Sequence, residues 1–364
     1  MKVQRLKISD TDFTWLVLGN DLLPIKPIQE YIRFLNNLAR SPNTVRSYAN
    51  HLKLYWEYLD FIRKDWKDVK LNDFADFLTW LRQAHADNII SLTLEESKRT
   101  ESTISTILTA ISSFYNFHQQ LGNTDIQLTQ SSSTRHRRYK PLLHHITKNK
   151  PTRTKLIKLK IQKILPKTLT QEQVKCAINA CNSLRDQFLI SLLYESGIRI
   201  GQALGLRHSD IKSWDNEIQI QPRPNNENMA RSKSNFPNVI HITPYLMTLY
   251  SRYLLEEFND HNCDFIFIQI SQKHSPGKPL NYRAVRDLFA RLSQKVGFCI
   301  TPHMLRHTHA TELLRNGWDC SYVQKRLGHS SIQTTINTYA HLNNEDLKKA
   351  FTNYQIKRMN NNEN

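Results

Sequence analysis

Apolar residues recur at the spacing of an amphipathic helix along most of the first third of the chain. Four stretches show this spacing, at residues 27–39, 41–62, 69–86 and 100–121. In the second stretch the large side chains fall on one helical stripe, formed by Tyr48, Leu52, Leu54, Tyr55 and Tyr58. Such aromatics can stack on bases, but a stripe at this spacing is more typical of a packed core. The pattern therefore predicts a compact helical domain.

Two of these helices carry start signals. "SPNT" opens the second stretch and "TEST" opens the fourth, and Ser41 and Thr100 are residue types that cap helix N-termini. We place the helical domain at residues 26–122, with residues 1–25 as an N-terminal extension.

From about residue 165 onward the pattern is again helical, with one interruption. Thr170 is a suitable N-cap for the first helix, and Gly197 ends the second. Residues 216–222 alternate apolar and polar and residues 238–242 are rich in β-branched types, which predicts a β-hairpin with a polar, basic turn. Helices are expected at residues 172–183, 184–197, 200–212, 243–258, 281–297, 301–317, 320–328 and 331–342.

The expected fold class is therefore mainly α with a small β-hairpin, in two domains. The second domain covers residues 165–345 and is followed by a tail at residues 346–364. Residues 123–164 join the domains, and between Arg135 and Lys163 there are eleven Lys or Arg and no Asp or Glu. Such a run is often a solvated linker, but it also fits an extended strap that neutralises phosphates along a duplex.

The charge balance points to a polyanionic partner. There are 50 Lys and Arg against 32 Asp and Glu, a formal net charge of +18. This excess fits nucleic acid or an anionic membrane surface. Neither a signal peptide nor an apolar stretch of about 18 residues is evident, so we expect a soluble, cytoplasmic protein that binds nucleic acid and not a membrane.

The five cysteines are scattered, and none forms a C-x-x-C motif. This use of cysteine predicts reduced thiols, mostly buried as small hydrophobic residues, and favours neither a disulfide framework nor a structural zinc site. The positions are Cys176, Cys181, Cys263, Cys299 and Cys320.

Six side chains in the second domain suit attack on a phosphodiester. An arginine fork binds two phosphate oxygens and stays charged, so two arginines can stabilise the extra negative charge of a pentacoordinate phosphorane. Histidines can donate to the same oxygens or move protons. A tyrosine becomes a nucleophile when cations and a base assist it, and a lysine can protonate the leaving oxygen. The candidates are Arg199, Lys233, His303, Arg306, His329 and Tyr339.

The stretch "HMLRHTHA" also raises a metal interpretation, because His303 and His307 share a helical face. A zinc hydrolase of that type needs glutamate directly after the first histidine, and here that residue is Met304. The charge of Arg306 on the same face would also repel a dication. We therefore expect no metal, and we interpret His307 and His309 mainly as framework residues.

Four segments resemble the successive motifs of the tyrosine recombinase (phage integrase) family. They are "SGIRIGQALGLRHSDI", "RSKSN", "TPHMLRHTHATELL" and "LGHSSIQTTINTYAH". In addition, "SPNTVRSYANHLKLYWEYL" resembles that family's core-binding domain, so the resemblance covers about residues 25–345. Most specific is H-x-x-R followed by L-G-H and then by a tyrosine ten residues after that histidine. The resemblance implies the family's architecture of a helical core-binding domain and a mostly helical catalytic domain that clamp a duplex.

Carried over by position, the resemblance implies that Tyr339 forms a 3′-phosphotyrosyl link and frees a 5′-hydroxyl. Arg199 and Arg306 would clamp the scissile phosphate. His303 would assist proton transfer and hold an oxygen, and His329 would be a second histidine at the phosphate.

The turn of the hairpin carries the sixth residue. Lys233 would be the general acid for the leaving 5′-oxygen, and it is favoured over Arg231 because lysine gives up a proton more readily. Three residues after the first arginine, many family members carry a carboxylate where this chain has Gln202. Glutamine can only hydrogen-bond, so we expect it to tune the site and not to inactivate it.

The resemblance further implies double-stranded DNA as the substrate, no cofactor, and strand exchange by a tetramer on two DNA sites. Length, the opening "MKVQRLKISD" and the "ARSKS" form of the lysine motif are most similar to transposon-encoded members. These members imply companion transposon-encoded recombinases and a bacterial, nucleoid-associated protein. The alternatives are a non-catalytic DNA-binding accessory protein and a DNA-relaxing enzyme of the type IB topoisomerase class.

Overall fold

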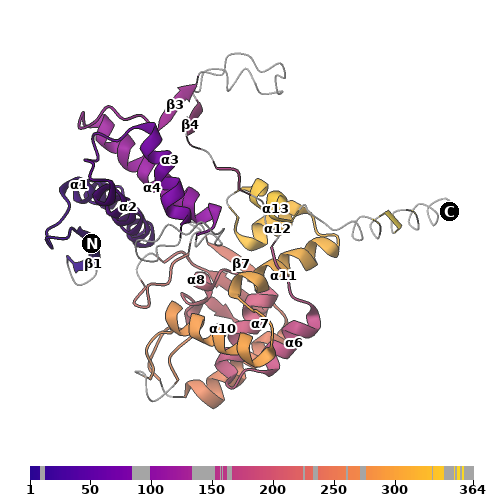
Figure 1. Cartoon of the computed structure of the whole chain (residues 1–364). Coiled ribbons are helices and arrows are strands. Elements are labelled where there is room, and N and C mark those ends of the chain that lie inside the picture. Colours follow the sequence, from indigo (N-terminus) through magenta and orange to yellow (C-terminus); the bar gives the residue numbers. More distant parts are fainter. Residues whose placement is uncertain are drawn as a thin grey trace. The chain divides into compact units, whose positions relative to one another are not determined.

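Figure 1 shows the computed structural model of the chain, which divides into two compact units, Met1–Lys163 and Ile164–Asn364. The residues described are 1–8, 13–83, 99–132, 152–155, 157, 159–161, 166–223, 226–232, 237–259, 261–270, 276–329, 331–339, 348, 351–352 and 355.

The first unit is built mainly from helices. Ser41 and Thr100 cap two of these helices, because each side-chain oxygen accepts from a backbone N–H three residues later, as the sequence predicts. Tyr55 and Tyr58 are buried, and the Tyr55 and Tyr115 hydroxyls lie 2.8 Å apart in the core. The aromatic stripe is therefore confirmed as core. The helices are α1 (Lys26–Asn37), α2 (Pro42–Ile62), α3 (Leu71–Arg82) and α4 (Glu101–Gln120).

Two short antiparallel sheets accompany these helices. The residues expected as an N-terminal extension form β1 (Lys2–Lys7) and β2 (Phe13–Leu18), and Val17 from β2 is buried in the core of the unit. Part of the basic segment pairs as β3 (Thr129–Ser132) with β4 (Thr152–Lys155). Most of the basic run from Arg135 to Lys163 lies outside the described residues, so the strap hypothesis stays a prediction.

The second unit is also mostly helical. Thr170 accepts from the Gln173 N–H while Gln173 reaches back to the Thr170 N–H, which confirms the predicted helix start. Its elements are α6 (Gln171–Asn179), α7 (Leu184–Ser196), α8 (Ile200–Ala203), η1 (His208–Asp210), β5 (Ile211–Lys212), η2 (Ser213–Asp215), β6 (Glu217–Ile220), β7 (Asn238–His241), α9 (Pro244–Tyr253), η3 (Leu254–Phe258), α10 (Tyr282–Val296), α11 (Pro302–Arg315), α12 (Cys320–Leu327) and α13 (Ile332–Tyr339).

The predicted hairpin is present and carries one further strand. β6 pairs with β7 in the register Ile218 to Ile240, and the short β5 completes a sheet in the order β5–β6–β7. Buried Ile218, Ile220 and Ile240 join the core, which is what alternation of apolar and polar residues requires. The turn between β6 and β7 includes the lysine motif.

The expectation that most cysteines are buried is wrong. Only Cys181 is buried, whereas Cys176 and Cys299 are exposed and the other two are partly exposed; all five are free thiols. The physical reason is position on the helix: Cys176 lies opposite buried Val174 and Ala177 on α6, so it faces solvent. Within the described part of the chain, no helix has the length and apolar character needed to span a bilayer.

Candidate active site

The first candidate residue, Arg199, follows a sharply turned helix end. Gly197 terminates α7 with φ +64°, a left-handed conformation that favours glycine. A Cβ atom at Gly197 would also lie 2.5 Å from the His309 ring and 2.8 Å from Leu327. Both the backbone conformation and the close packing therefore require glycine at position 197. The same packing fixes the backbone from which Arg199 extends.

Arg306 ties this turn to a second one. It extends from α11, is only 4% exposed, and donates from Nη1 to the Gly197 carbonyl at 2.7 Å and from Nη2 to the Leu327 carbonyl at 2.9 Å. Arg199 Nη1 donates to the Gly328 carbonyl at 3.3 Å. Two arginines that are distant in sequence thus share the turn from Leu327 to His329.

His329 lies in that shared turn. Its backbone N–H donates to the Gln324 carbonyl, and its Nδ1 is 2.8 Å from the Thr335 hydroxyl on α13. Burial, followed by the positive charges of Arg306 and Arg199, lowers the pKa of His329 to about 4. The imidazole is therefore neutral at pH 7, and Nε2 is the ring nitrogen that remains for a substrate.

His303 and His307 lie one turn apart on α11, with ring centroids 6.4 Å apart. His303 is exposed, whereas His307 is partly buried. Burial, and after it the nearby charges of His303 and Arg306, lower the pKa of His307. The structure therefore places both imidazoles on the face of α11 near Arg306, and the framework role expected for His307 stays a prediction.

Gln202 bridges two motifs. Its Oε1 accepts from the Arg199 backbone N–H at 2.9 Å, and its Nε2 donates to the Ser232 hydroxyl at 3.5 Å. A carboxylate could make the first contact but could not donate to Ser232. Glutamine thus connects the turn at Arg199 to the residue that precedes Lys233.

Arg326 is a third arginine at this site, and the sequence patterns did not single it out. Arg326 donates from Nε to His309 Nε2 at 3.0 Å, and from Nη2 to the carbonyls of Glu195 and His241 at 3.0 and 3.1 Å. It therefore joins α7, β7 and α11 to the end of α12. The expectation that His309 is framework is consistent with these contacts, since His309 is 7% exposed.

His309 should make the protein less stable as the pH falls. Burial first, and then the charges of Arg326 and Arg306, lower the pKa of His309 to about 3 from an ordinary value of 6.5. Between these values the unfolded chain binds more protons than the folded one, so the free energy of unfolding falls as pH decreases through this window. The loss is about 1.4 kcal/mol for each pH unit below 6.5, and urea unfolding at pH 7.5, 6.5 and 5.5 measures it.

A His309→Gln variant tests the origin of this slope, because glutamine keeps an acceptor for Arg326 but does not titrate. We expect the pH slope between 6.5 and 5.5 to flatten in this variant. Tyr322→Phe, at a side chain that is 66% exposed, is the control and should keep the wild-type slope. A His309→Gln slope equal to that of the wild type would contradict the assignment.

Two predicted site residues are not described as side chains. Lys233 lies outside the described residues, and for Tyr339 only the backbone is described, as the last residue of α13. The structure thus brings together Arg199, Arg306 and His329, with His303 on the adjoining face of α11. Among the described side chains, no group of three or more His, Cys, Asp or Glu could hold a metal ion.

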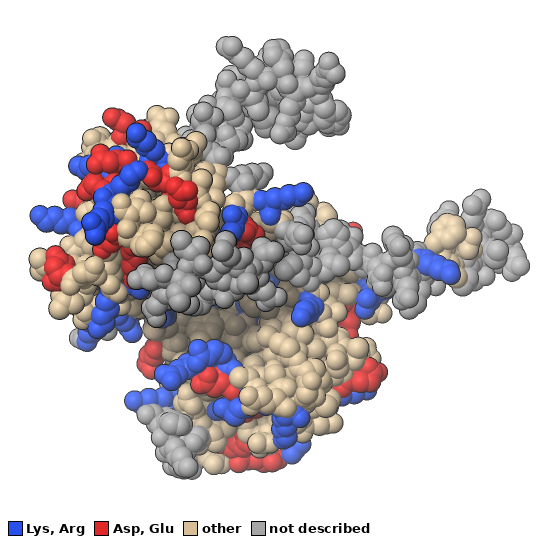
Figure 2. Space-filling view, viewed as in Figure 1, with Lys and Arg blue, Asp and Glu red and all other residues tan. Residues whose placement is uncertain are grey.

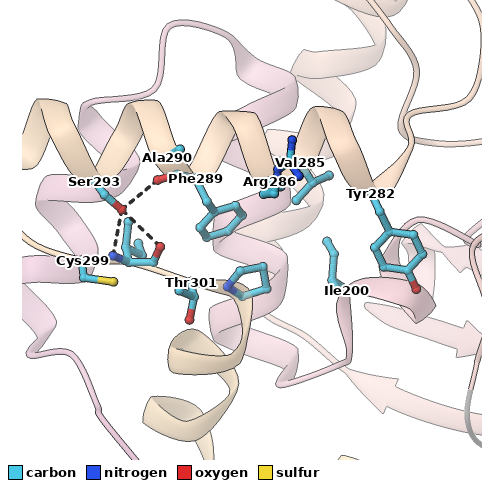
Figure 3. Close-up of a pocket in the computed structure, with 11 residues that line it drawn as sticks. Ile200, Tyr282, Val285, Arg286, Phe289, Ala290, Ser293, Cys299 and Thr301 are labelled. Atoms are coloured by element: carbon cyan, nitrogen blue, oxygen red, sulfur yellow. Dashed lines mark hydrogen bonds between the residues drawn. The ribbon is translucent and has the colours of Figure 1, made fainter. Parts of the chain in front are cut away.

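A pocket of about 380 Å³ lies beside this constellation, between α10 and the start of α11 (Figure 3). Ile200 and Pro302 line it, and they are the sequence neighbours of Arg199 and His303. Tyr282 and Ser293 lie toward opposite ends in Figure 3. The described residues that line the pocket include no Asp, Glu or His.

Basic side chains are distributed over both units. On the face that Figure 2 shows, Lys and Arg are interspersed with Asp and Glu and do not form one continuous patch. The net charge of +18 is therefore not concentrated in the described residues of this face.

Comparisons with known proteins agree with the motif assignments. The model for the phage integrase family matches residues 167–346, and the model for the phage integrase N-terminal SAM-like domain matches residues 28–122. Transposase A from transposon Tn554 of Staphylococcus aureus is 39% identical over 356 residues, which cover 97% of this chain and 98% of that protein. Tyrosine recombinase XerA of Pyrococcus horikoshii is 25% identical over 334 residues, 92% of this chain and 93% of that protein.

Solved structures share the fold. The Tn1549 transposon integrase in complex with a circular intermediate DNA has a TM-score of 0.61 at 16% identity, covering 90% of this chain and 99% of that one. XerH site-specific recombinase bound to its difH substrate has a TM-score of 0.58 at 20% identity, covering 91% of this chain and 85% of that one.

Proposed function

The chain belongs to the phage integrase family of tyrosine recombinases, and we propose on this basis that it cuts and rejoins DNA strands through a covalent bond between Tyr339 and a 3′-phosphate. Its reaction is DNA strand transfer, and its similarity to Tn554 transposase A supports integration and excision of a transposon as the biological role.

The observation that carries the proposal is the bridge made by Arg306. Its guanidinium binds the backbone at Gly197 and at Leu327, so one cationic group holds together the turns that carry Arg199 and His329. Two guanidinium groups thus bond to the turn that carries His329, and their charges act on its imidazole. This is the donor set that a phosphodiester needs when it gains negative charge during substitution.

In the proposed reaction, the Tyr339 oxygen forms a bond to phosphorus while the bond from phosphorus to the 5′-oxygen breaks. The phenolic proton passes from Tyr339 to the imidazole of His303, and the ammonium group of Lys233 gives a proton to the departing 5′-oxygen. Arg199 and Arg306 stabilise the added negative charge, and His303 and His329 donate to phosphate oxygens or move protons. The phosphotyrosine ester keeps the energy of the phosphodiester, so the reaction requires neither ATP nor a metal ion.

Gln202 supports this arrangement in place of the carboxylate expected from many family members. It holds the Arg199 backbone and donates to Ser232, so it links the phosphate clamp to the turn of Lys233. We propose that it positions these groups without adding negative charge, which is consistent with tuning of the site and not with its loss.

The proposed substrate is double-stranded DNA, gripped by a DNA-binding domain at residues 26–122 and a catalytic domain at residues 165–345. The solved relatives named above were captured with DNA, and this supports the same substrate here. We further propose a tetramer that joins two DNA sites, together with companion transposon-encoded recombinases. The basic segment at residues 123–164 would follow the phosphate backbone between the two domains.

A nicked DNA substrate tests the proposal directly. The duplex carries the target site and releases a short 5′-hydroxyl fragment after cleavage, so that religation is prevented and the protein–DNA adduct accumulates. We expect the full chain to form an adduct that resists boiling in detergent, at an equal rate with or without EDTA. Denaturing gel electrophoresis of end-labelled DNA measures it.

Each contrary outcome favours a different alternative to the proposed function. No adduct on DNA that the protein binds would favour a non-catalytic DNA-binding accessory protein. Adduct that disappears with EDTA would contradict the metal-independent mechanism. Relaxation of supercoiled plasmids that lack the target site, without pairing of two sites, would favour a DNA-relaxing enzyme of the type IB topoisomerase class.

A further inference from the structure

The segment that leads into Lys233 is held far more firmly than its composition predicts. Residues 226–232, with the sequence "NENMARS", form an arm between β6 and β7 that we call the lysine arm. Asn226 and Asn228 are 9% and 7% exposed, and Ala230 is fully buried. Burial of amides this polar is unfavourable unless each finds hydrogen-bond partners.

The side-chain amide of Asn228 makes three hydrogen bonds. Its Nδ2 donates to the carbonyls of Leu204 at 2.9 Å and Leu280 at 2.8 Å, and its Oδ1 accepts from the Ala230 N–H at 3.0 Å. One side chain thereby fixes the arm to the end of α8 and to the segment before α10. Leu204 lies only five residues after Arg199.

Asn226 closes the base of the arm. Its Nδ2 donates to the Ala230 carbonyl at 2.7 Å, and its Oδ1 accepts from Arg207 at 3.2 Å. Directly after Asn228, Met229 has φ +59°, a left-handed conformation that is uncommon for residues other than glycine. The hydrogen bonds of the asparagines hold this strained turn in place.

The far end of the arm lies against α8. A Cβ atom on Gly201 would be 2.4 Å from the Arg231 carbonyl oxygen and 2.3 Å from the Tyr282 hydroxyl, so only glycine allows this approach. Ser232 then accepts from Gln202, whose other end binds the Arg199 backbone. Lys233 is the next residue in the sequence.

We propose that Asn228 is a positioning residue for the step assigned to Lys233, because it holds the lysine arm, which ends one residue before Lys233, against α8. This inference rests on the proposed role of Lys233 as general acid. It assigns the buried asparagine to one step of the reaction, the protonation of the leaving 5′-oxygen. Loss of the amide leaves the phosphate clamp assembled, because Arg306 makes its contacts to Gly197 and Leu327 independently of the arm.

A pair of nicked substrates isolates that step. In one, the scissile phosphate has its natural 5′-oxygen, and in the other a sulfur atom bridges the same position. A thiolate leaves without a proton far more readily than an alkoxide, since thiols have a pKa of about 8.5 whereas water has a pKa of about 15.7. The sulfur substrate therefore needs the nucleophile and the clamp but not the general acid.

Asn228→Ala should slow single-turnover cleavage of the oxygen substrate by about 10²-fold, the effect of moving a catalytic group by about an ångström. It should cleave the sulfur substrate within about threefold of the wild-type rate, as should Lys233→Ala, whose loss on oxygen is about 10²–10⁴-fold. Ser293→Ala is the matched control: Ser293 bonds both backbone groups of Ile300 beside α10, away from the arm, and its loss should keep the oxygen-to-sulfur rate ratio.

Equal slowing of both substrates in Asn228→Ala, with Lys233→Ala rescued by sulfur, would overturn the inference and leave the proposed function intact. If sulfur fails to rescue Lys233→Ala, the general-acid role of Lys233 falls, and the inference falls with it. If Asn228→Ala does not fold, Ser232→Ala decides, since this hydroxyl is only partly buried. A selective loss on oxygen supports the inference, and an unchanged rate ratio overturns it.

Discussion

Replacing Tyr339 with phenylalanine should reduce the covalent protein–DNA adduct by on the order of 10⁴-fold or more, while DNA binding stays within about threefold. The variant lacks only the oxygen that would bond to phosphorus. Tyr339 is the last residue of α13. The side chain of Thr335, on the same helix, contacts His329, so the helix that carries Tyr339 is joined to the turn of His329. Adduct yield on the nicked substrate and gel-shift binding measure the two effects.

Tyr322→Phe is the control for this experiment. Tyr322 lies on α12 and is 66% exposed, so loss of its hydroxyl should leave both adduct and binding unchanged. Adduct from Tyr339→Phe at the wild-type rate would assign the nucleophile to another side chain. Loss of adduct in both variants would indicate a general sensitivity of this region and not a nucleophile.

Arg306→Lys should lower the cleavage rate by about 10²–10³-fold and also destabilise the fold. The rate falls because lysine carries a point charge and cannot reproduce the planar fork that meets two phosphate oxygens. Stability falls by about 1–3 kcal/mol for each buried carbonyl that loses its donor, and Gly197 and Leu327 both depend on Arg306. Single-turnover cleavage and thermal melting separate the two losses.

Arg315→Lys, at an exposed position near the end of the same helix, should change neither quantity. Cleavage is measured at a temperature where both variants are fully folded. An Arg306→Lys variant that is less stable but cleaves at the wild-type rate under these conditions would reduce Arg306 to a structural role.

The helices could be predicted because their determinants are local. Spacing of apolar residues and capping side chains such as Ser41, Thr100 and Thr170 act within one or two turns, and the structure confirms each cap. The β1–β2 hairpin was not predicted, because its stability depends on the surface of α2 that it covers. β2 packs against both α1 and α2, and Val17 is buried there.

The reacting residues could be located from motif spacing, but the residues that hold them could not. Asn226 and Asn228 lie in a stretch whose composition is typical of a solvent-exposed turn, and only tertiary folding brings carbonyls at Leu204 and Leu280 to them. The pairing of Arg326 with His309 likewise joins two helices, and no local pattern signals it.

The reach of Arg306 has a consequence for how the protein is made. Its bond to Gly197 spans 109 positions in the chain, and its bond to Leu327 joins a segment that is synthesised later still. Translation proceeds from the N-terminus, so Arg199 leaves the ribosome long before its clamp partner and before the nucleophile. A nascent or truncated chain that ends before Leu327 thus lacks the contacts by which Arg306 joins the turns of Arg199 and His329. Strand breakage is delayed until synthesis of the catalytic unit is complete.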